Sequence, residues 1–241
     1  MNEVSNAPIP SGMPPAPESF FQVWIKAITK PAEQTFAEMA ASPNAKQMTA
    51  YLWVFIGFLV NFILSSLVSN VAMRQIMQQY GMDSRLLEGG GIGATLVRAV
   101  CGGPILALIA TIFFAIGVYI LQWIAKMFGG KGTADQLAYA LAAISAPVSI
   151  ISGVLSLFGA IPFVGLCFGL FSFLLSIYVI VLEIIAIKGV NQISWGAAIG
   201  TFFIPALVVL CICGCIVLIT FAALGPAIGN VFSTINQSLM P

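Results

Sequence analysis

Five long apolar segments constrain this chain more than any single motif does. They are Thr49–Met73, Ala99–Phe128, Ala134–Phe158, Phe163–Lys188 and Trp195–Leu224. A helix of about 20 residues crosses a hydrocarbon core of about 30 Å, so each segment is long enough to span a bilayer. Only 7% of the residues are charged, whereas soluble domains carry about 25%. The sequence therefore predicts an all-α, polytopic membrane helical bundle with five transmembrane helices.

Changes in composition divide the chain into four parts. Residues 1–18 hold five of the thirteen prolines and are predicted to form a disordered, Pro-rich tail. Residues 19–48 are predicted to form short amphipathic helices at the membrane interface. Residues 49–225 contain the five-helix transmembrane domain, and residues 226–241 are predicted to be a short C-terminal tail.

The segment before the first span has the spacing of two short helices. In the first helix, apolar side chains recur at i, i+3, i+4 and i+7, namely Phe21, Trp24, Ile25 and Ile28. Pro31–Ala41 is predicted to be a second helix that presents Phe36 and Met39. We expect both helices to lie in the interface with Phe21, Trp24 and Ile28 as anchors. The alternative is a water-facing pair packed on the loops.

A polar turn at Gly129–Thr133 separates the second span from the third. Thr133 followed by Gln136 is a capping box, in which each side chain accepts from a backbone N–H at a helix start. Neither this turn nor Gly89–Gly93 has the complete sequence and the preceding strand of a nucleotide-binding loop. The turn therefore predicts a helix start and no phosphate site.

Basic residues are distributed unequally between the two ends of five alternating spans. Lysines and arginines divide into Lys26, Lys30, Lys46, Lys126, Lys131 and Lys188 at one end, and Arg74, Arg85 and Arg98 at the other. Because cytoplasmic loops carry the excess of such residues, the N-terminus is predicted to be cytoplasmic and the C-terminus outside.

The residue content argues against catalysis. The chain has no histidine, which removes the commonest general base and a common metal ligand. The run Cys211, Cys213, Cys215 places its middle thiol well away from the other two on a helix, so packing is the better explanation. A net charge of +1 with scattered cations does not favour nucleic-acid binding. We expect no catalytic, cofactor or metal site.

Glu183 is the one carboxylate predicted to lie inside a span, because Asp135 is at the polar start of the third span. It lies near Lys188, which is on a different helix face at i+5, so an interhelical partner is expected. Lys126, Lys131 and Tyr139 are predicted to reach the same side of the membrane and complete a polar cluster. Glu183 then either ties helix ends together or acts as a proton- or ligand-linked switch.

Three groups of residues resemble the Yip1 domain family of five-span membrane proteins. They are Trp24-x-x-x-Ile28-Thr29-Lys30-Pro31 with Phe36; Gly129-Gly130-x-Gly132-Thr133-x-x-Gln136-Leu137-x-Tyr139-Ala140 with Pro147; and Tyr178 with Lys188-Gly189-Val190 ahead of Trp195 and Ala197. The resemblance covers roughly residues 20–225. The Lys-Pro step and the short tails look more like prokaryotic members, which implies a location in the cytoplasmic membrane.

The resemblance implies a non-enzymatic membrane scaffold or adaptor involved in membrane organisation or trafficking. Its expected partners are the lipid bilayer and other membrane proteins or a second copy of the chain. Eukaryotic family members engage small GTPases of the Rab type through a cytoplasmic N-terminal region, and this chain lacks their Asp-Leu-Tyr-Gly-Pro motif, so that partner is not carried over. The alternative function is a small-solute or ion transporter or channel, suggested by Pro104, Pro147 and Pro205 within spans.

Overall fold

A computed structural model of the chain describes residues 19–79, 93, 97–159, 161 and 163–239. The predicted N-terminal tail and most of the polar connection between the first two spans lie outside these residues. Within them the chain is helical: α1 (Phe20–Thr29), α2 (Glu33–Ala41), α3 (Gln47–Gln79), the π-helical turn η2 (Arg98–Gly102), α5 (Gly103–Met127), α6 (Ala134–Phe158), α7 (Val164–Asn191) and α8 (Trp195–Leu239).

The all-α class and the five spanning segments are confirmed. Five described helices are long and apolar enough to cross a membrane. The bounds of α6 agree with the predicted third span, because its start is fixed by a local capping box at Thr133 and Gln136. The predicted fifth span agrees with the apolar segment Trp195–Pro226, and α8 continues beyond it to Leu239, through most of the residues predicted to be the C-terminal tail. Pro226 does not end the helix, because a membrane helix tolerates a proline when its freed carbonyl is satisfied otherwise.

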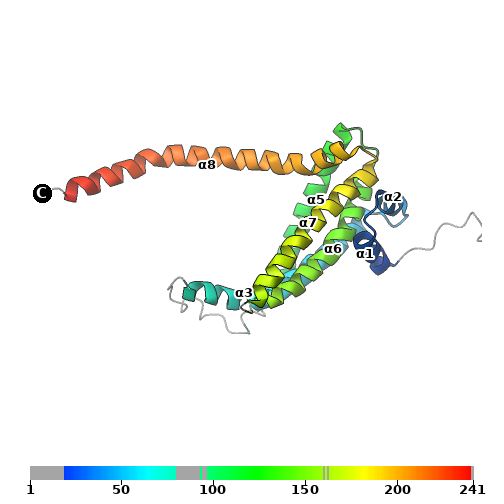
Figure 1. The fold of residues 1–241 in the computed structure, drawn as a ribbon, viewed down its shortest axis with the longest axis horizontal. Coiled ribbons are helices and arrows are strands. Elements are labelled where there is room, and N and C mark those ends of the chain that lie inside the picture. The colour runs from blue at the N-terminus through cyan, green and yellow to red at the C-terminus, as the bar shows by residue number, and fades with distance from the viewer. Residues whose placement is uncertain (1–18, 80–92, 94–96, 160, 162, 240–241) are drawn as a thin grey trace, which may run out of the picture.

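Four of the long helices form a bundle and the fifth leaves it. Helices α3, α5, α6 and α7 lie side by side, with α1 and α2 against one end of them (Figure 1). Helix α8 begins near that end and then runs away from the bundle (Figure 1). Its residues from Phe203 to Ala222 are exposed or partly exposed. An all-round apolar helix without protein cover is expected to face lipid.

Helices α3 and α6 form the tightest pair in the bundle. Trp53 contacts Tyr139 (ring centroids 4.9 Å apart), and Asn61, further along α3, contacts Gly153, further along α6. Because the residue numbers of the contacting pairs increase along both helices, the two helices run parallel. A Cβ on Gly153 would lie 2.9 Å from the Asn61 Cα, which means that only glycine permits this approach. The Asn61 amide also donates to the Ser149 carbonyl oxygen (2.8 Å). Small residues and one interhelical hydrogen bond are typical of packing in membranes.

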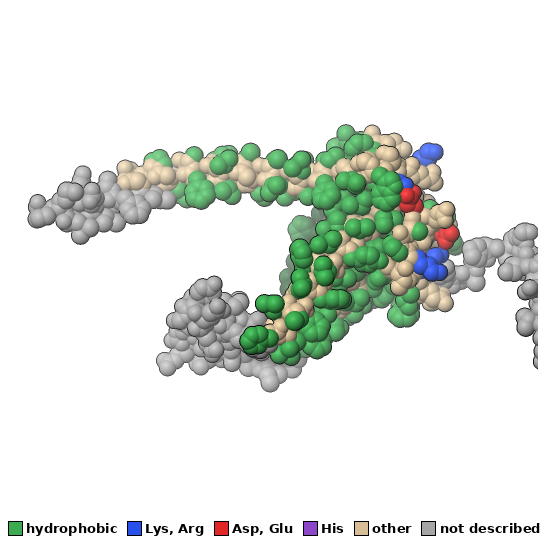
Figure 2. Space-filling model, viewed as in Figure 1, with side chains coloured by type: hydrophobic (Ala, Val, Ile, Leu, Met, Phe, Trp, Pro, Cys, Tyr) green, Lys and Arg blue, Asp and Glu red, His purple; other side chains and the backbone are tan. Residues whose placement is uncertain are grey.

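The protein's buried core is concentrated at the end that carries α1 and α2. The first half of α6, from Leu137 to Ile144, is buried along its whole length. Phe36 of α2, Val54 of α3 and Leu182 of α7 complete this core and are fully buried. Elsewhere, large apolar side chains cover the helices and charged side chains gather at the α1–α2 end of the visible face (Figure 2). Among the described residues, the buried core and the charged side chains therefore lie at the same end of the bundle, near α1 and α2.

Candidate functional site

The two N-terminal helices are tied to each other and to α7 by ion pairs. Lys26 of α1 pairs with Glu38 of α2 (3.0 Å). Glu33, in the first turn of α2, pairs with Lys188 near the end of α7. Lys188 also lies over the Trp195 ring, 4.7 Å from its centroid, which adds a cation–π contact. We call α1 and α2 together the N-terminal cap (residues 19–41).

Helix α2 approaches α7 unusually closely. A Cβ on Gly189 would lie 2.5 Å from the Glu33 carbonyl oxygen and 3.2 Å from the Phe36 Cβ. Phe36 and Met39 are 0% and 3% exposed. The expectation that these two side chains lie toward the membrane interface is therefore wrong. Gly189 removes the side chain that would hold α2 away, so the apolar face of α2 is buried against the bundle.

The side chains with which α1 packs on the bundle differ from the predicted apolar face. Its buried residues are Val23 and Ala27. The Trp24 ring meets the Trp53 ring of α3 edge to face, with centroids 5.8 Å apart. The Tyr178 hydroxyl of α7 donates to the Ile28 carbonyl oxygen (2.6 Å). A capping box of Ser19 and Gln22, which was not predicted, starts the helix.

The three predicted anchors of α1 are consequently divided between two surfaces. Phe21 is 60% exposed and points away from the bundle, together with Phe20 and Ile25. Trp24 and Ile28 are only partly exposed and contribute to the contacts with α3 and α7. The helical spacing placed all three on one apolar face. Helix α1 instead has two apolar faces, of which one is buried against the bundle and the other, with Phe21, is exposed.

The turn between α5 and α6 is fastened to the end of α7 by buried amides. Gln122 of α5 donates to the Gly132 carbonyl oxygen (2.7 Å) and to the Asn191 side-chain oxygen (2.9 Å). The backbone N–H of Lys131 donates to the Asn191 carbonyl oxygen (3.0 Å). The Gln122 and Asn191 side chains are almost fully buried. Buried amides in good geometry hold elements in a fixed relation, because leaving either one unpaired is costly.

The same turn explains the glycines of the predicted motif. A Cβ on Gly130 would lie 2.8 Å from the Ala125 carbonyl oxygen, and one on Gly132 would lie 2.8 Å from the Val190 carbonyl oxygen. Gly129 has a φ of 82°, a conformation that glycine adopts without strain. Gln122 and Asn191 were not predicted as part of the site, although polar amides at the ends of apolar spans were the available signal.

The predicted polar cluster around Glu183 is not assembled as expected. Lys188 pairs with Glu33. Lys126 and Lys131 are exposed, and Tyr139 is buried against Trp53. Among the residues that the structure describes, none forms an ion pair or hydrogen bond with Glu183. Lys188 pairs with Glu33 of the cap and not with Glu183. A sequence pattern does not indicate which of two carboxylates lies closer to a lysine in the folded chain.

Glu183 lies deeper than its distance from Lys188 indicated. Helix α7 continues to Asn191, eight residues beyond Glu183, so the carboxylate lies about 12 Å from the helix end. Its side chain is only partly exposed. A carboxylate at this depth is costly to keep charged and is a functional-site hypothesis by default.

The described residues do not bring metal ligands together. In the described ranges, no group of three His, Cys, Asp or Glu side chains is placed to hold an ion. Cys211, Cys213 and Cys215 are all exposed on α8. The prolines also leave their helices continuous, since α6 passes through Pro147 and α8 through Pro205. The broken helices on which the transporter alternative depended are therefore not found at these two positions.

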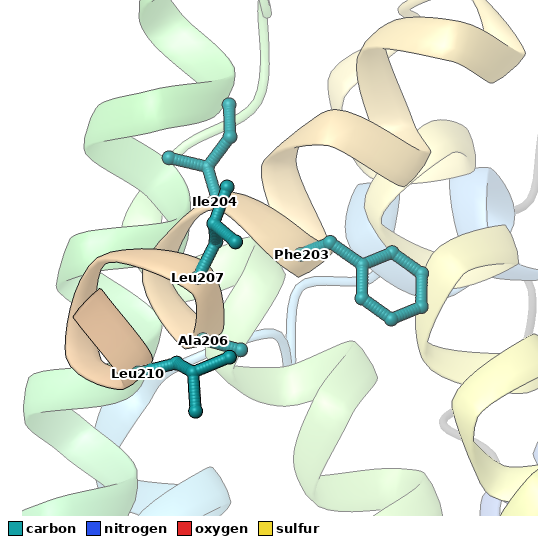
Figure 3. Close-up of a pocket in the computed structure, with 5 residues that line it drawn as sticks. All are labelled: Phe203, Ile204, Ala206, Leu207 and Leu210. Carbon is teal, nitrogen blue, oxygen red and sulfur yellow. The ribbon is translucent and has the colours of Figure 1, made fainter. Parts of the chain in front are cut away.

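A shallow apolar hollow of about 320 Å³ lies where α8 leaves the bundle. Five side chains of α8 line it: Phe203, Ile204, Ala206, Leu207 and Leu210 (Figure 3). The lining has no polar surface. A site of this kind offers no group that would orient a polar substrate.

The fold and the capped polar end define a polytopic α-helical membrane protein whose N-terminal helices are part of its folded domain. The family model of the Yip1 domain matches residues 25–233, and this chain belongs to the Yip1 domain family. The match includes all of α2 and the end of α1, so much of the cap lies inside the family domain. Neither a curated protein nor a solved structure matched the chain significantly.

Proposed function

We propose that this member of the Yip1 domain family is a non-enzymatic membrane scaffold or adaptor involved in membrane organisation or trafficking. The observation that carries the proposal is the N-terminal cap, which is fixed to α7 by the close approach at Gly189 and by the Lys188–Glu33 pair. A fixed polar surface on one side of the membrane is suited to holding a partner, because little ordering free energy is lost on binding.

The cap surface is mixed in character and accessible. Glu38 has a side chain that is 66% exposed. Phe20, Phe21 and Ile25 add an exposed apolar strip on α1. Apolar anchors beside polar groups are common where proteins bind other proteins. The proposed partners are other membrane proteins or a second copy of the chain.

We place the cap on the cytoplasmic side of a prokaryotic cytoplasmic membrane, with the C-terminus outside. The support is the excess of lysines at the ends of spans on the cap side. Reporter fusions at residue 131 and at the C-terminus are expected to report opposite sides. Reports from the same side would contradict both the orientation and the number of spans.

The test of the adaptor proposal is site-specific photo-crosslinking in native membranes. A photoreactive residue at Gln34, which is exposed on α2, should give a stoichiometric adduct with one or a few proteins. The matched control is Phe113, which is 68% exposed in the middle of α5 and should react with lipid. Cap positions that give no protein adduct while the control behaves as expected would refute the adaptor proposal.

Glu183 is proposed as the element that senses partner engagement. Of the two roles predicted for it, the switch has more support than the tie, because no described cation pairs with this carboxylate. In the proposed role the carboxyl group exchanges a proton or a counter-ion when a partner binds the cap. Glu183→Gln would then fold normally and fail to form the Gln34 adduct, whereas a tie predicts a loss of both.

A further inference from the structure

Two exposed lysines flank the tight turn between α5 and α6. Lys126 is in the last turn of α5, and Lys131 follows after Gly129 and Gly130. The turn is closed by backbone hydrogen bonds from Gly129 to the Lys126 carbonyl oxygen (3.0 Å) and from Gly130 to the Ala125 carbonyl oxygen (2.8 Å). Both lysines are therefore held close to one end of α5.

The turn is fixed to the bundle by groups other than the lysine side chains. The Gln122 bonds to Gly132 and Asn191 hold its far end against α7, and the Lys131 backbone also donates to Asn191. Replacing either lysine side chain leaves all of these bonds in place. The two ammonium groups thus project from a preorganised backbone.

Exposed aromatic rings on α5 indicate where the headgroup region begins. Tyr119 is 51% exposed and Trp123 is 67% exposed, one to two turns before Lys126. Tyr and Trp side chains prefer the boundary between hydrocarbon and headgroups. The two lysines follow these rings toward water, at the depth where lipid phosphates lie.

The charge at this end of the molecule is unbalanced. The described carboxylates of the cap, Glu33 and Glu38, are occupied by Lys188 and Lys26. No described carboxylate lies within ion-pair distance of Lys126 or Lys131. The nearest acidic residue along the chain is Asp135, which is exposed in the first turn of α6. Two cations beside one carboxylate leave a net positive surface, which complements an anionic headgroup.

We propose that the α5–α6 turn is a binding site for an anionic phospholipid. Lys126 and Lys131 contact the lipid phosphate, and Trp123 contacts the part of the acyl chains nearest the headgroup. This site is separate from the cap surface and does not depend on the proposed adaptor function. Its occupant is a lipid of the surrounding bilayer and not a soluble anion, because the aromatic rings place the lysines at the membrane surface.

The test is native mass spectrometry of the full chain in micelles that contain equal amounts of phosphatidylglycerol and phosphatidylcholine with the same acyl chains. The parent protein should retain phosphatidylglycerol in preference to phosphatidylcholine. The double variant Lys126→Gln/Lys131→Gln should reduce that preference at least fivefold, and Lys126→Arg/Lys131→Arg should keep it. A parent without preference, or a Gln variant with the parent's preference, would overturn the proposal.

Two controls separate this site from general attraction. Lys30→Gln/Lys46→Gln removes the same charge from exposed positions outside the turn and should change the preference less than twofold. An equal loss in both double variants would contradict a site at the turn. Inorganic phosphate at millimolar concentration should not displace the lipid, and displacement would identify a soluble-anion site instead. Should the Gln variant misfold, titration of the parent with salt still decides, because a preference that salt does not weaken is not electrostatic.

Discussion

The capped end and helix α8 show opposite ways in which an apolar sequence can be used. At the capped end, glycines allow backbone oxygens of neighbouring segments to approach closely, and the side-chain amides of Gln122 and Asn191 form a hydrogen bond. Each described carboxylate of the cap also has a lysine partner. Along α8 beyond Thr201, a Cβ added at Gly214 or Gly225 would have no neighbouring atom within 4 Å, and the side chains whose burial is described are exposed or partly exposed. A hydrophobic residue in the first region must fit protein, whereas one in the second must only be compatible with lipid. Substitutions of one apolar residue by another should therefore be costly at the cap and almost free on the exposed part of α8.

The largest expected difference is between two glycine substitutions. Gly189→Ala places a Cβ 2.5 Å from the Glu33 carbonyl oxygen, so α2 must shift. We expect a loss of about 1–3 kcal/mol, as for other overpacked sites. Gly214→Ala meets nothing and should be neutral or slightly stabilising, because alanine is the better helix former. Thermal unfolding in detergent measures both, and equal effects would break the comparison between the two regions.

The next effect concerns the amides that hold the α5–α6 turn. Gln122→Met conserves length but removes the donor to Gly132 and Asn191, which leaves two buried acceptors unpaired. The expected loss is about 1–3 kcal/mol. Gln34→Met on exposed α2 is the matched control and should change stability by less than about 0.5 kcal/mol. A Gln122 variant as stable as this control would show that the turn is held by packing alone.

Glu183 offers a test in which stability and function should separate. Because no described residue pairs with this carboxylate, Glu183→Gln is expected to be at least as stable as the parent in detergent. Glu183→Ala should be similar or slightly less stable, since it also removes side-chain packing. A strong destabilisation by Gln would show that Glu183 is a structural tie and would exclude the switch proposal.

The two ion pairs should each contribute little to stability, and their contributions should differ. The Lys188 and Glu33 side chains are 13% and 42% exposed, whereas the Lys26 and Glu38 side chains are 25% and 66% exposed. Double-mutant cycles to alanine should give a coupling of about 0.2–0.5 kcal/mol for Lys26 with Glu38. The coupling of Lys188 with Glu33 should be larger, at about 1 kcal/mol, because this pair is less screened. The reverse order would contradict a cap that is held mainly through α7.

Local features of the sequence predicted the fold well. The capping box at Thr133 and Gln136 involves residues three positions apart, and it fixed the start of α6 correctly. The five spans followed from length and apolar content, and they needed no knowledge of neighbours. The predicted end of the fifth span, Leu224, is close to the end of the apolar segment at Pro226, although the helix itself continues to Leu239.

The candidate site depended on contacts between distant segments, and the sequence did not predict them. Gln122 and Asn191 are 69 residues apart, and Glu33 meets Lys188 only because Gly189 lets α2 approach. The pattern on α1 marked Phe21 and Trp24 as one face, yet the bundle covers Trp24 and leaves Phe21 exposed. Hydrophobic periodicity identifies a face, but it does not say whether protein or lipid will cover it.

Amide hydrogen exchange of the full chain in lipid nanodiscs tests most directly whether the cap is part of the folded domain. Isolated helices of 10 and 9 residues, the lengths of α1 and α2, are not stable in water. When the cap is docked on the bundle, the amides of Val23–Thr29 and Phe36–Ala41 should be strongly protected, and Gly189→Ala should lower that protection while leaving α5 unchanged. Exchange of the cap at the rate of a free peptide, or protection that Gly189→Ala does not alter, would contradict the account.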